Sequence, residues 1–191
     1  MVILPFIPFA AMLAIIVATI LRGFTIRQRT GDRPLAFLSA TGVQRIAGLS
    51  FAISTIVLIA ASVIAAQSGG SRFSFPAAIL AIMGALLVIV AQVQMGRAWR
   101  IGVREGDAPL FVSHGLFRFS RNPIFVGMMT VGLAAALASE LWWAWAALAV
   151  FVVSCAVQVR IEERHLEASF GQPYRDFCAT VSRWLGLGSR A

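Results

Sequence analysis

Five long runs of apolar residues alternate with polar segments along the chain. They cover approximately residues 2–21, 46–66, 75–93, 123–138 and 141–159. A helix needs roughly 20 consecutive apolar residues to cross the bilayer core. Each run therefore predicts a membrane-spanning helix, and the fourth run is the shortest. Only Ser139 and Glu140 separate the fourth run from the fifth, so these two form either a tight helical hairpin or one bent helix, which would leave four spans.

The arginines mark alternate connections between these runs. Fifteen of the sixteen follow the first, third and fifth runs: Arg22, Arg27, Arg29, Arg33 and Arg45; Arg97, Arg100, Arg104, Arg118 and Arg121; Arg160, Arg164, Arg175, Arg183 and Arg190. Arg72 is the exception. Basic residues accumulate on the cytoplasmic side of membrane proteins. The pattern predicts an N-terminus outside, a cytoplasmic C-terminus, and Trp142, Trp143 and Trp145 at the outer interface.

Composition agrees with a membrane protein. Hydrophobic residues make up 59% of the chain and charged residues 13%, and the mean hydropathy is +0.85, outside the range of soluble domains. Topology explains the net charge of +8, because the arginines are spread over three membrane-flanking segments. A nucleic-acid partner would require one basic patch, and we expect none.

The chain predicts a single domain, residues 1–191, of all-α class with a cytoplasmic C-terminal helical cap. Its first half, residues 1–93, supplies three transmembrane helices, and residues 94–191 carry the polar motifs. Cys155 and Cys178 are too few for a disulfide framework. With only His114 and His165 as additional soft ligands, we expect no metal site.

The first motif is the block of residues 115–125, which leads into the fourth run. Asn122 followed by Pro123 predicts a helix N-cap and a first-turn proline. The free backbone N–H groups of such a helix end would face water and attract an anion. Arg118 and Arg121 flank it, either as ligands for a carboxylate or phosphate or as interface residues that reach toward headgroups. Gly115 would let the loop approach a ligand closely.

The second motif follows the fifth run and contains Glu162 and Glu163. Adjacent helical residues point about 100 degrees apart, so at most one of the two faces a binding site. A salt-bridged helix end involving Arg160 and Arg164 is the alternative.

Further along, Gly171 predicts a helix stop and Pro173 a new helix. An apolar face on that helix is formed by Tyr174, Phe177, Val181, Trp184 and Leu185.

Together these motifs resemble the isoprenylcysteine carboxyl methyltransferase family and its bacterial members, and the related phospholipid methyltransferases. The resemblance covers approximately residues 92–185. It rests on the glycine-to-phenylalanine block 115–125, the hydrophobic hairpin, Glu162-Glu163-Arg164-His165-Leu166, and Phe170-Gly171-Gln172-Pro173-Tyr174. The segment 94–103 ahead of the first block belongs to it as well.

This resemblance implies methyl transfer from S-adenosylmethionine to a lipophilic acceptor at the cytoplasmic face of the inner membrane. The residues implied to line the cofactor site are His114, Gly115, Leu116, Phe117, Arg121, Asn122, Pro123, Glu163 and Tyr174. Arg121 and Glu162 are the candidate catalytic residues. The usual Arg-His-Pro-x-Tyr of eukaryotic members reads Arg121-Asn122-Pro123-Ile124-Phe125 here, so no role that needs an imidazole at 122 or a phenol at 125 is carried over.

The acceptor stays open between phospholipid amines, small thiols and isoprenoid acids. A carboxylate or thiolate needs no base, whereas a protonated amine needs one, and Glu162 and His165 are the candidates. Gln92, Gln94 and Gln158 mark either an acceptor tunnel or hydrogen bonds between helices. Two alternatives of other classes are a non-catalytic membrane accessory protein and an NADPH-dependent membrane reductase of related architecture.

Overall fold

The computed structural model describes residues 3–30, 41–99 and 112–186, and these fold into helices without a β-strand. The main helices are α1 (Ile7–Thr30), α2 (Gly42–Gln67), α3 (Ser74–Met95), α4 (Pro123–Ser139), α5 (Trp142–Phe170) and α6 (Gln172–Thr180). Short 3-10 helices are η1 (Leu4–Phe6), η3 (Gly96–Ala98) and η4 (Gly115–Arg118). Four of the arginines lie outside the described residues: Arg33, Arg100, Arg104 and Arg190. Residues 100–103 of the predicted segment 94–103 lie outside them as well.

All five apolar runs form helices, which confirms the predicted all-α membrane fold. Within the described residues, four helices are long and apolar enough to cross a bilayer: Leu4–Gln28, Gly42–Gln67, Ser74–Met95 and Trp142–Phe170. Helix α4 has 17 residues, short of the roughly 20 that a bilayer core requires. Exposed Ile56, Met83 and Val153 lie on the outer surface of the helices, where apolar side chains would face lipid.

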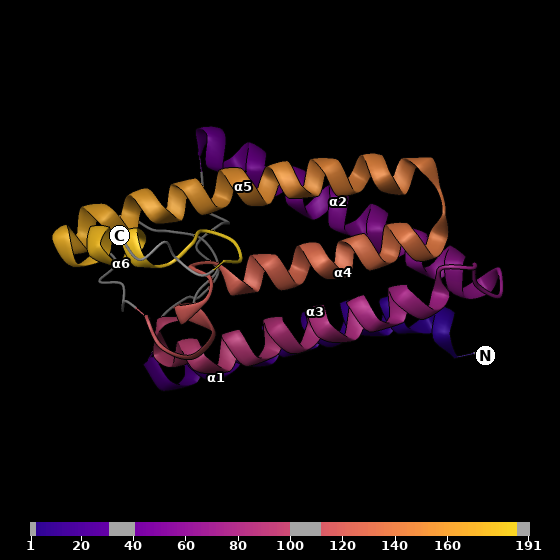
Figure 1. Cartoon of the computed structure of the whole chain (residues 1–191), viewed down its shortest axis with the longest axis horizontal. Helices are drawn as coiled ribbons and strands as arrows, with labels where there is room; N and C mark the ends of the chain where they lie inside the picture. The colour runs from indigo at the N-terminus through magenta and orange to yellow at the C-terminus, as the bar shows by residue number, and fades with distance from the viewer. Residues whose placement is uncertain (1–2, 31–40, 100–111, 187–191) are drawn as a thin grey trace.

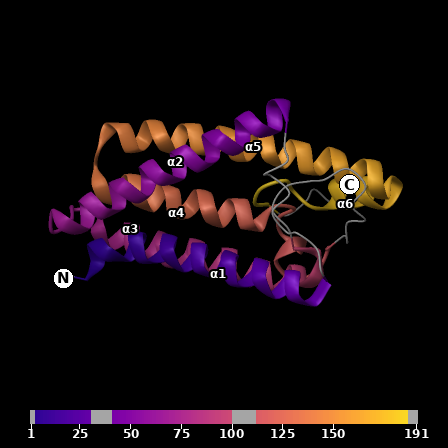
Figure 2. The ribbon, with the colours of Figure 1, turned by 180° about the vertical axis from the view of Figure 1, so that it is seen from behind.

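The chain forms an elongated bundle in which α4 lies between the other helices (Figure 1). Helix α3 packs extensively on α4, and α2 packs on α5. Figure 2 shows α2 crossing α4 and α5 obliquely. The tight hairpin predicted between α4 and α5 is confirmed. Glu140 makes its turn with φ of 53° and pairs with Arg72 at 3.3 Å.

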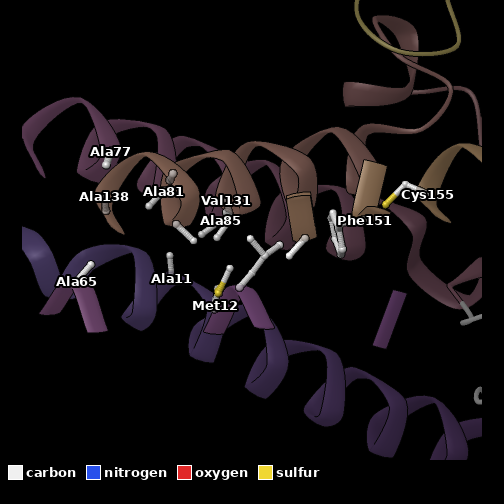
Figure 3. Packing of buried hydrophobic residues seen from close by; sticks show 14 residues of the cluster. Ala11, Met12, Ala65, Ala77, Ala81, Ala85, Val131, Ala138, Phe151 and Cys155 are labelled. Atoms are coloured by element: carbon white, nitrogen blue, oxygen red, sulfur yellow. The ribbon is translucent and has the colours of Figure 1, made fainter. Parts of the chain in front are cut away.

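Small side chains let the central helices approach closely. Alanines contribute most of the buried cluster between α1, α2, α3, α4 and α5 (Figure 3), with Met12, Val131 and Phe151 filling the gaps. Gly84 of α3 faces Gly127 of α4, and a Cβ atom on Gly127 would stand 2.6 Å from the Gly84 carbonyl oxygen. Close approach of helix backbones through small residues is typical of membrane bundles.

The two ends of the bundle differ in charge. The C-terminal ends of α1, α3 and α5 and the start of α4 meet at one end, together with α6 (Figures 1 and 2). Arg22 lies on α1, Arg164 lies on α5, and Arg121 lies just before α4. Arg72 lies at the opposite end, beside the α4–α5 turn. The arginine-rich segments that the sequence assigned to one side therefore do gather at one end, as far as the described residues extend.

Candidate functional site

The start of α4 is where the first motif meets the C-terminal part of the chain. Asn122 occupies the N-cap position and Pro123 the first turn, as predicted, but the Asn122 side chain does not cap the helix. Its amide Nδ2 instead donates to the Arg183 carbonyl oxygen at 3.1 Å and to Glu163 Oε1 at 3.4 Å. Ser120 is buried, and its Oγ accepts from the Asn122 backbone N–H. The helix start is thus tied to two distant segments.

Glu163 of α5 is the centre of an ion cluster at this helix start. Its Oε1 lies 3.2 Å from Arg121 Nε. Its Oε2 accepts a hydrogen bond of 2.8 Å from Arg183 Nε, and Arg183 Nη2 lies 2.8 Å from the same oxygen as an ion pair. The side chains of Arg121 and Glu163 are each 12% exposed, and that of Arg183 is 40% exposed. One carboxylate faces two guanidinium groups, so the cluster carries a net positive charge.

Helix α6 covers a side of this cluster. Arg121 Nη1 donates to the Cys178 carbonyl oxygen at 3.4 Å. Tyr174 is 3% exposed, and its ring packs 6.2 Å from that of Phe177. Burial raises the pKa of the Tyr174 phenol, so the hydroxyl stays neutral. The hydrogen bond to Glu163 raises the pKa of Arg183, which keeps this guanidinium charged.

Residues 181–186, which we call the C-terminal strap, cross the start of α4. The Arg121 backbone N–H donates to the Ser182 carbonyl oxygen at 2.9 Å, and Ser120 Oγ donates to the Arg183 carbonyl oxygen at 3.5 Å. Asn122 and Pro123 are consequently buried. The expectation that the start of α4 faces water is therefore wrong, because the strap covers it.

The strap also corrects the prediction of a helical apolar face that continues to Leu185. Helix α6 ends at Thr180, and Val181 is extended, with φ of −122° and ψ of 129°. Val181 is buried, whereas Leu185 is 66% exposed. The chain leaves the helix here because it turns toward the start of α4. The predicted helix stop at Gly171, with φ of 57°, and the first-turn proline of α6 are both present.

Gly115 makes a close approach of a kind that the sequence did not reveal. Its φ is 62°, and a Cβ atom there would stand 2.7 Å from Gln94 Nε2. Gln94 Oε1 accepts the Leu116 backbone N–H at 2.7 Å. In this structure the glycine therefore makes room for a glutamine side chain of α3.

The three glutamines at the helix ends all form hydrogen bonds inside the protein. Besides Gln94, Gln92 Nε2 donates to Thr19 Oγ1 of α1 at 2.9 Å. Gln158 Nε2 donates to Glu162 Oε1 at 3.3 Å. The bonds of Gln92 and Gln94 join separate elements, as the hydrogen-bonding alternative expects, whereas the bond of Gln158 lies within α5.

The remaining predicted site residues lie around the cluster at different depths. His114, which precedes η4, is exposed, whereas on η4 Leu116 is partly buried and Phe117 is 6% exposed. The Leu116 carbonyl oxygen accepts the Ser120 backbone N–H at 3.2 Å, which joins η4 to the cluster. Glu162 and His165 are partly buried on α5. Arg183 and Ser120 were missed, because no motif or spacing in the sequence points to them.

Metal ligands do not gather in this part of the structure. Among residues 3–30, 41–99 and 112–186, no three His, Cys, Asp or Glu side chains lie close enough to hold an ion. Glu163 instead has guanidinium and amide groups around it. These partners suit charge-assisted hydrogen bonding.

The fold and this cluster define an all-helical integral membrane protein with a polar site at one end of the bundle. Residues 73–173 match the family model for phospholipid methyltransferase. Because this match covers more than half of the 191 residues, the chain belongs to the phospholipid methyltransferase family. Comparisons with curated proteins and with solved structures gave no significant match. The family indicates methyl transfer involving a membrane-associated substrate.

Proposed function

We propose that the protein transfers a methyl group from S-adenosylmethionine to a lipophilic acceptor at the cytoplasmic face of the inner membrane. The observation that carries this proposal is the convergence of Arg121 and Glu163, which are 42 residues apart in the sequence, at one buried site. Both residues lie inside the part of the chain that matches the family model. A polar site at a helix end is also within reach of substrates from both water and lipid.

The residues of the cluster fit the amino-acid part of such a donor. Arg121 Nε is buried and makes no well-aligned hydrogen bond, although it lies near Glu163 Oε1. A buried donor group left in this state favours an added acceptor such as a carboxylate. Glu163 suits an ammonium group or ribose hydroxyls. His114, Gly115, Leu116, Phe117, Asn122, Pro123 and Tyr174 complete the proposed donor site.

The demands of the reaction on side chains are modest. A sulfonium methyl group undergoes in-line displacement, so the enzyme mainly holds the two reactants in line and excludes water. We assign Arg121 the task of fixing the donor's carboxylate. Glu162, hydrogen-bonded to Gln158, is the proposed base where the acceptor is a protonated amine. Neither a metal ion nor a nucleophilic side chain is required.

The acceptor class and the finer family assignment belong to the same proposal. The sequence motifs favour the isoprenylcysteine carboxyl methyltransferase branch, while the matched model describes phospholipid methyltransferases more broadly. In both cases the acceptor partitions into the membrane. Exposed apolar side chains along the helices, such as Ile20 and Val153, would contact the lipids from which it enters.

Ligand titration separates this proposal from its alternatives. Purified protein should release or absorb heat with S-adenosylmethionine and S-adenosylhomocysteine and give no signal with NADPH. Heat with NADPH alone would indicate a reductase. A folded protein that binds none of the three would be an accessory protein without a cofactor.

A further inference from the structure

Several hydrogen bonds hold the C-terminal strap against the candidate site. Three consecutive residues at the start of α4 bind it: Ser120 and Asn122 through their side chains, and Arg121 through its backbone N–H. The Arg183 side chain adds a hydrogen bond and an ion-pair contact to Glu163. Main-chain and side-chain contacts thus fix the same short segment against one helix start.

Arg183 contacts Oε2 of Glu163, whereas the other partners of this carboxylate lie near Oε1. Arg121 and Asn122 both approach Oε1, while Oε2 accepts a hydrogen bond from Arg183. A charge-assisted hydrogen bond of this kind is stronger than one between neutral groups. A second cation can reach Oε2 only if Arg183 leaves it.

The exposures of the two arginines show which one leaves more readily. The Arg121 side chain is 12% exposed and lies on a segment enclosed by α5 and α6. The Arg183 side chain is 40% exposed. Solvent can replace the partners of Arg183 without opening the helix bundle. Release of the strap would also uncover the first turn of α4.

We propose that the C-terminal strap is a latch, in which Arg183 holds the place on Glu163 that the ammonium group of the methyl donor takes. This inference rests on the proposed function. In the latched form Arg183 and the donor's ammonium compete for one carboxylate. Binding therefore selects the unlatched form, and the apparent affinity falls in proportion to the fraction of molecules that are unlatched.

Substitution of Arg183 tests the latch in two ways. Arg183→Gln removes the charge and the ion pair with Glu163, and Arg183→Lys keeps the charge without the planar guanidinium group. Arg175→Gln is the matched control, because Arg175 is exposed on α6 and pairs with Glu167 and Gln172 outside the cluster. All variants are purified as the full chain in detergent.

Hydrogen exchange measures the latch without any ligand. The Arg121 amide donates to the strap, so its exchange should be at least tenfold faster in Arg183→Gln, intermediate in Arg183→Lys and unchanged in Arg175→Gln. Equal protection in the wild type and Arg183→Gln would overturn the latch. This result is independent of whether the protein binds a methyl donor.

Ligand affinity tests the competition. S-adenosylhomocysteine, which has the ammonium group, should bind Arg183→Gln at least threefold more tightly than the wild type. Methylthioadenosine, which lacks the amino-acid part, should bind both equally. Unchanged or weaker binding of S-adenosylhomocysteine would overturn the inference and leave the proposed function standing, and so would an equal gain for both compounds. Absence of binding in every variant would remove the proposed function and the latch together.

Discussion

Glu163 supplies the negative charge of the cluster, and two guanidinium groups and one amide lie against its carboxylate. Removal of one member of a buried charged group costs more than a surface ion pair is worth, since the remaining charges lose their compensation. The cluster is therefore sensitive to single substitutions.

Arg121→Ala and Glu163→Ala should each weaken binding of S-adenosylmethionine at least tenfold, or about 1.4 kcal/mol. Arg121→Ala removes the proposed carboxylate ligand, and Glu163→Ala removes the ligand for the ammonium or ribose. Calorimetric titration measures the loss. Thermal unfolding of each variant, with Arg175→Gln as the reference, separates it from damage to the fold. Wild-type affinity in folded variants would assign both residues a structural role only.

Gly115→Ala should lower stability because it combines a positive φ with a collision. The left-handed backbone costs a non-glycine residue roughly 1–2 kcal/mol, and the new Cβ would also strike the Gln94 side chain. Gly42→Ala is the control, because its φ is 55° but nothing lies within 4 Å of its Cβ position. Thermal unfolding in detergent should show a larger loss for Gly115→Ala. Equal losses would mean that Gln94 simply moves aside.

At the scale of elements, hydrophobic runs predict the long helices well because burial in lipid depends on local composition. The runs located all five apolar helices, and Gly171 and Pro173 located the break between α5 and α6. The strap was not predictable in this way. Val181 and Leu185 continue a helical spacing, but contacts of Ser182 and Arg183 with residues some 60 positions earlier end the helix. Such long-range pairing leaves no periodic signal.

The same limit applies to the site. The Asn122-Pro123 pair predicted the start of α4, and the adjacent glutamates predicted an acidic end of α5. The direct ion pair between Glu163 and Arg121 is visible only in the structure. The position of the Gln94 side chain was not predictable either, because the space for it comes from Gly115, which is 21 residues away in the sequence. The motifs identified candidate site residues, but they did not show which side chains contact one another.

Gly127→Ala should separate α3 from α4. Its Cβ would meet the Gly84 carbonyl oxygen and the Val88 backbone nitrogen at 2.6 and 3.0 Å, and backbone atoms cannot rotate away. Gly48→Ala in α2 is the control, because nothing lies within 4 Å and alanine favours the helix by up to about 1 kcal/mol. The midpoint temperature of thermal unfolding should fall for Gly127→Ala and should stay level or rise for Gly48→Ala. A stable Gly127→Ala variant would show that this helix contact is loose.

At the scale of the whole molecule, charge and chemistry occupy the same end of the bundle. The proposed site lies at the ends of α1, α3 and α5, beside the arginine-bearing segments, and the α4–α5 turn with Arg72 lies at the other end (Figure 1). If the arginines set the orientation, they also place the site on the side where S-adenosylmethionine is present. One charge bias would then decide both topology and access to the methyl donor.

Cysteine labelling of intact cells tests this orientation. We expect Arg72→Cys to react with a membrane-impermeant maleimide in intact cells, and Arg118→Cys only after the cells are opened. Arg72 is 79% exposed in its side chain, and Arg118 is exposed on η4 beside the site. Alanine replaces Cys155 and Cys178 in the background, so that each variant has one thiol. The reverse pattern would place the site outside, where the cell offers no S-adenosylmethionine, and the proposed methyl transfer would then fail on access even if Arg121 and Glu163 bind the donor in detergent.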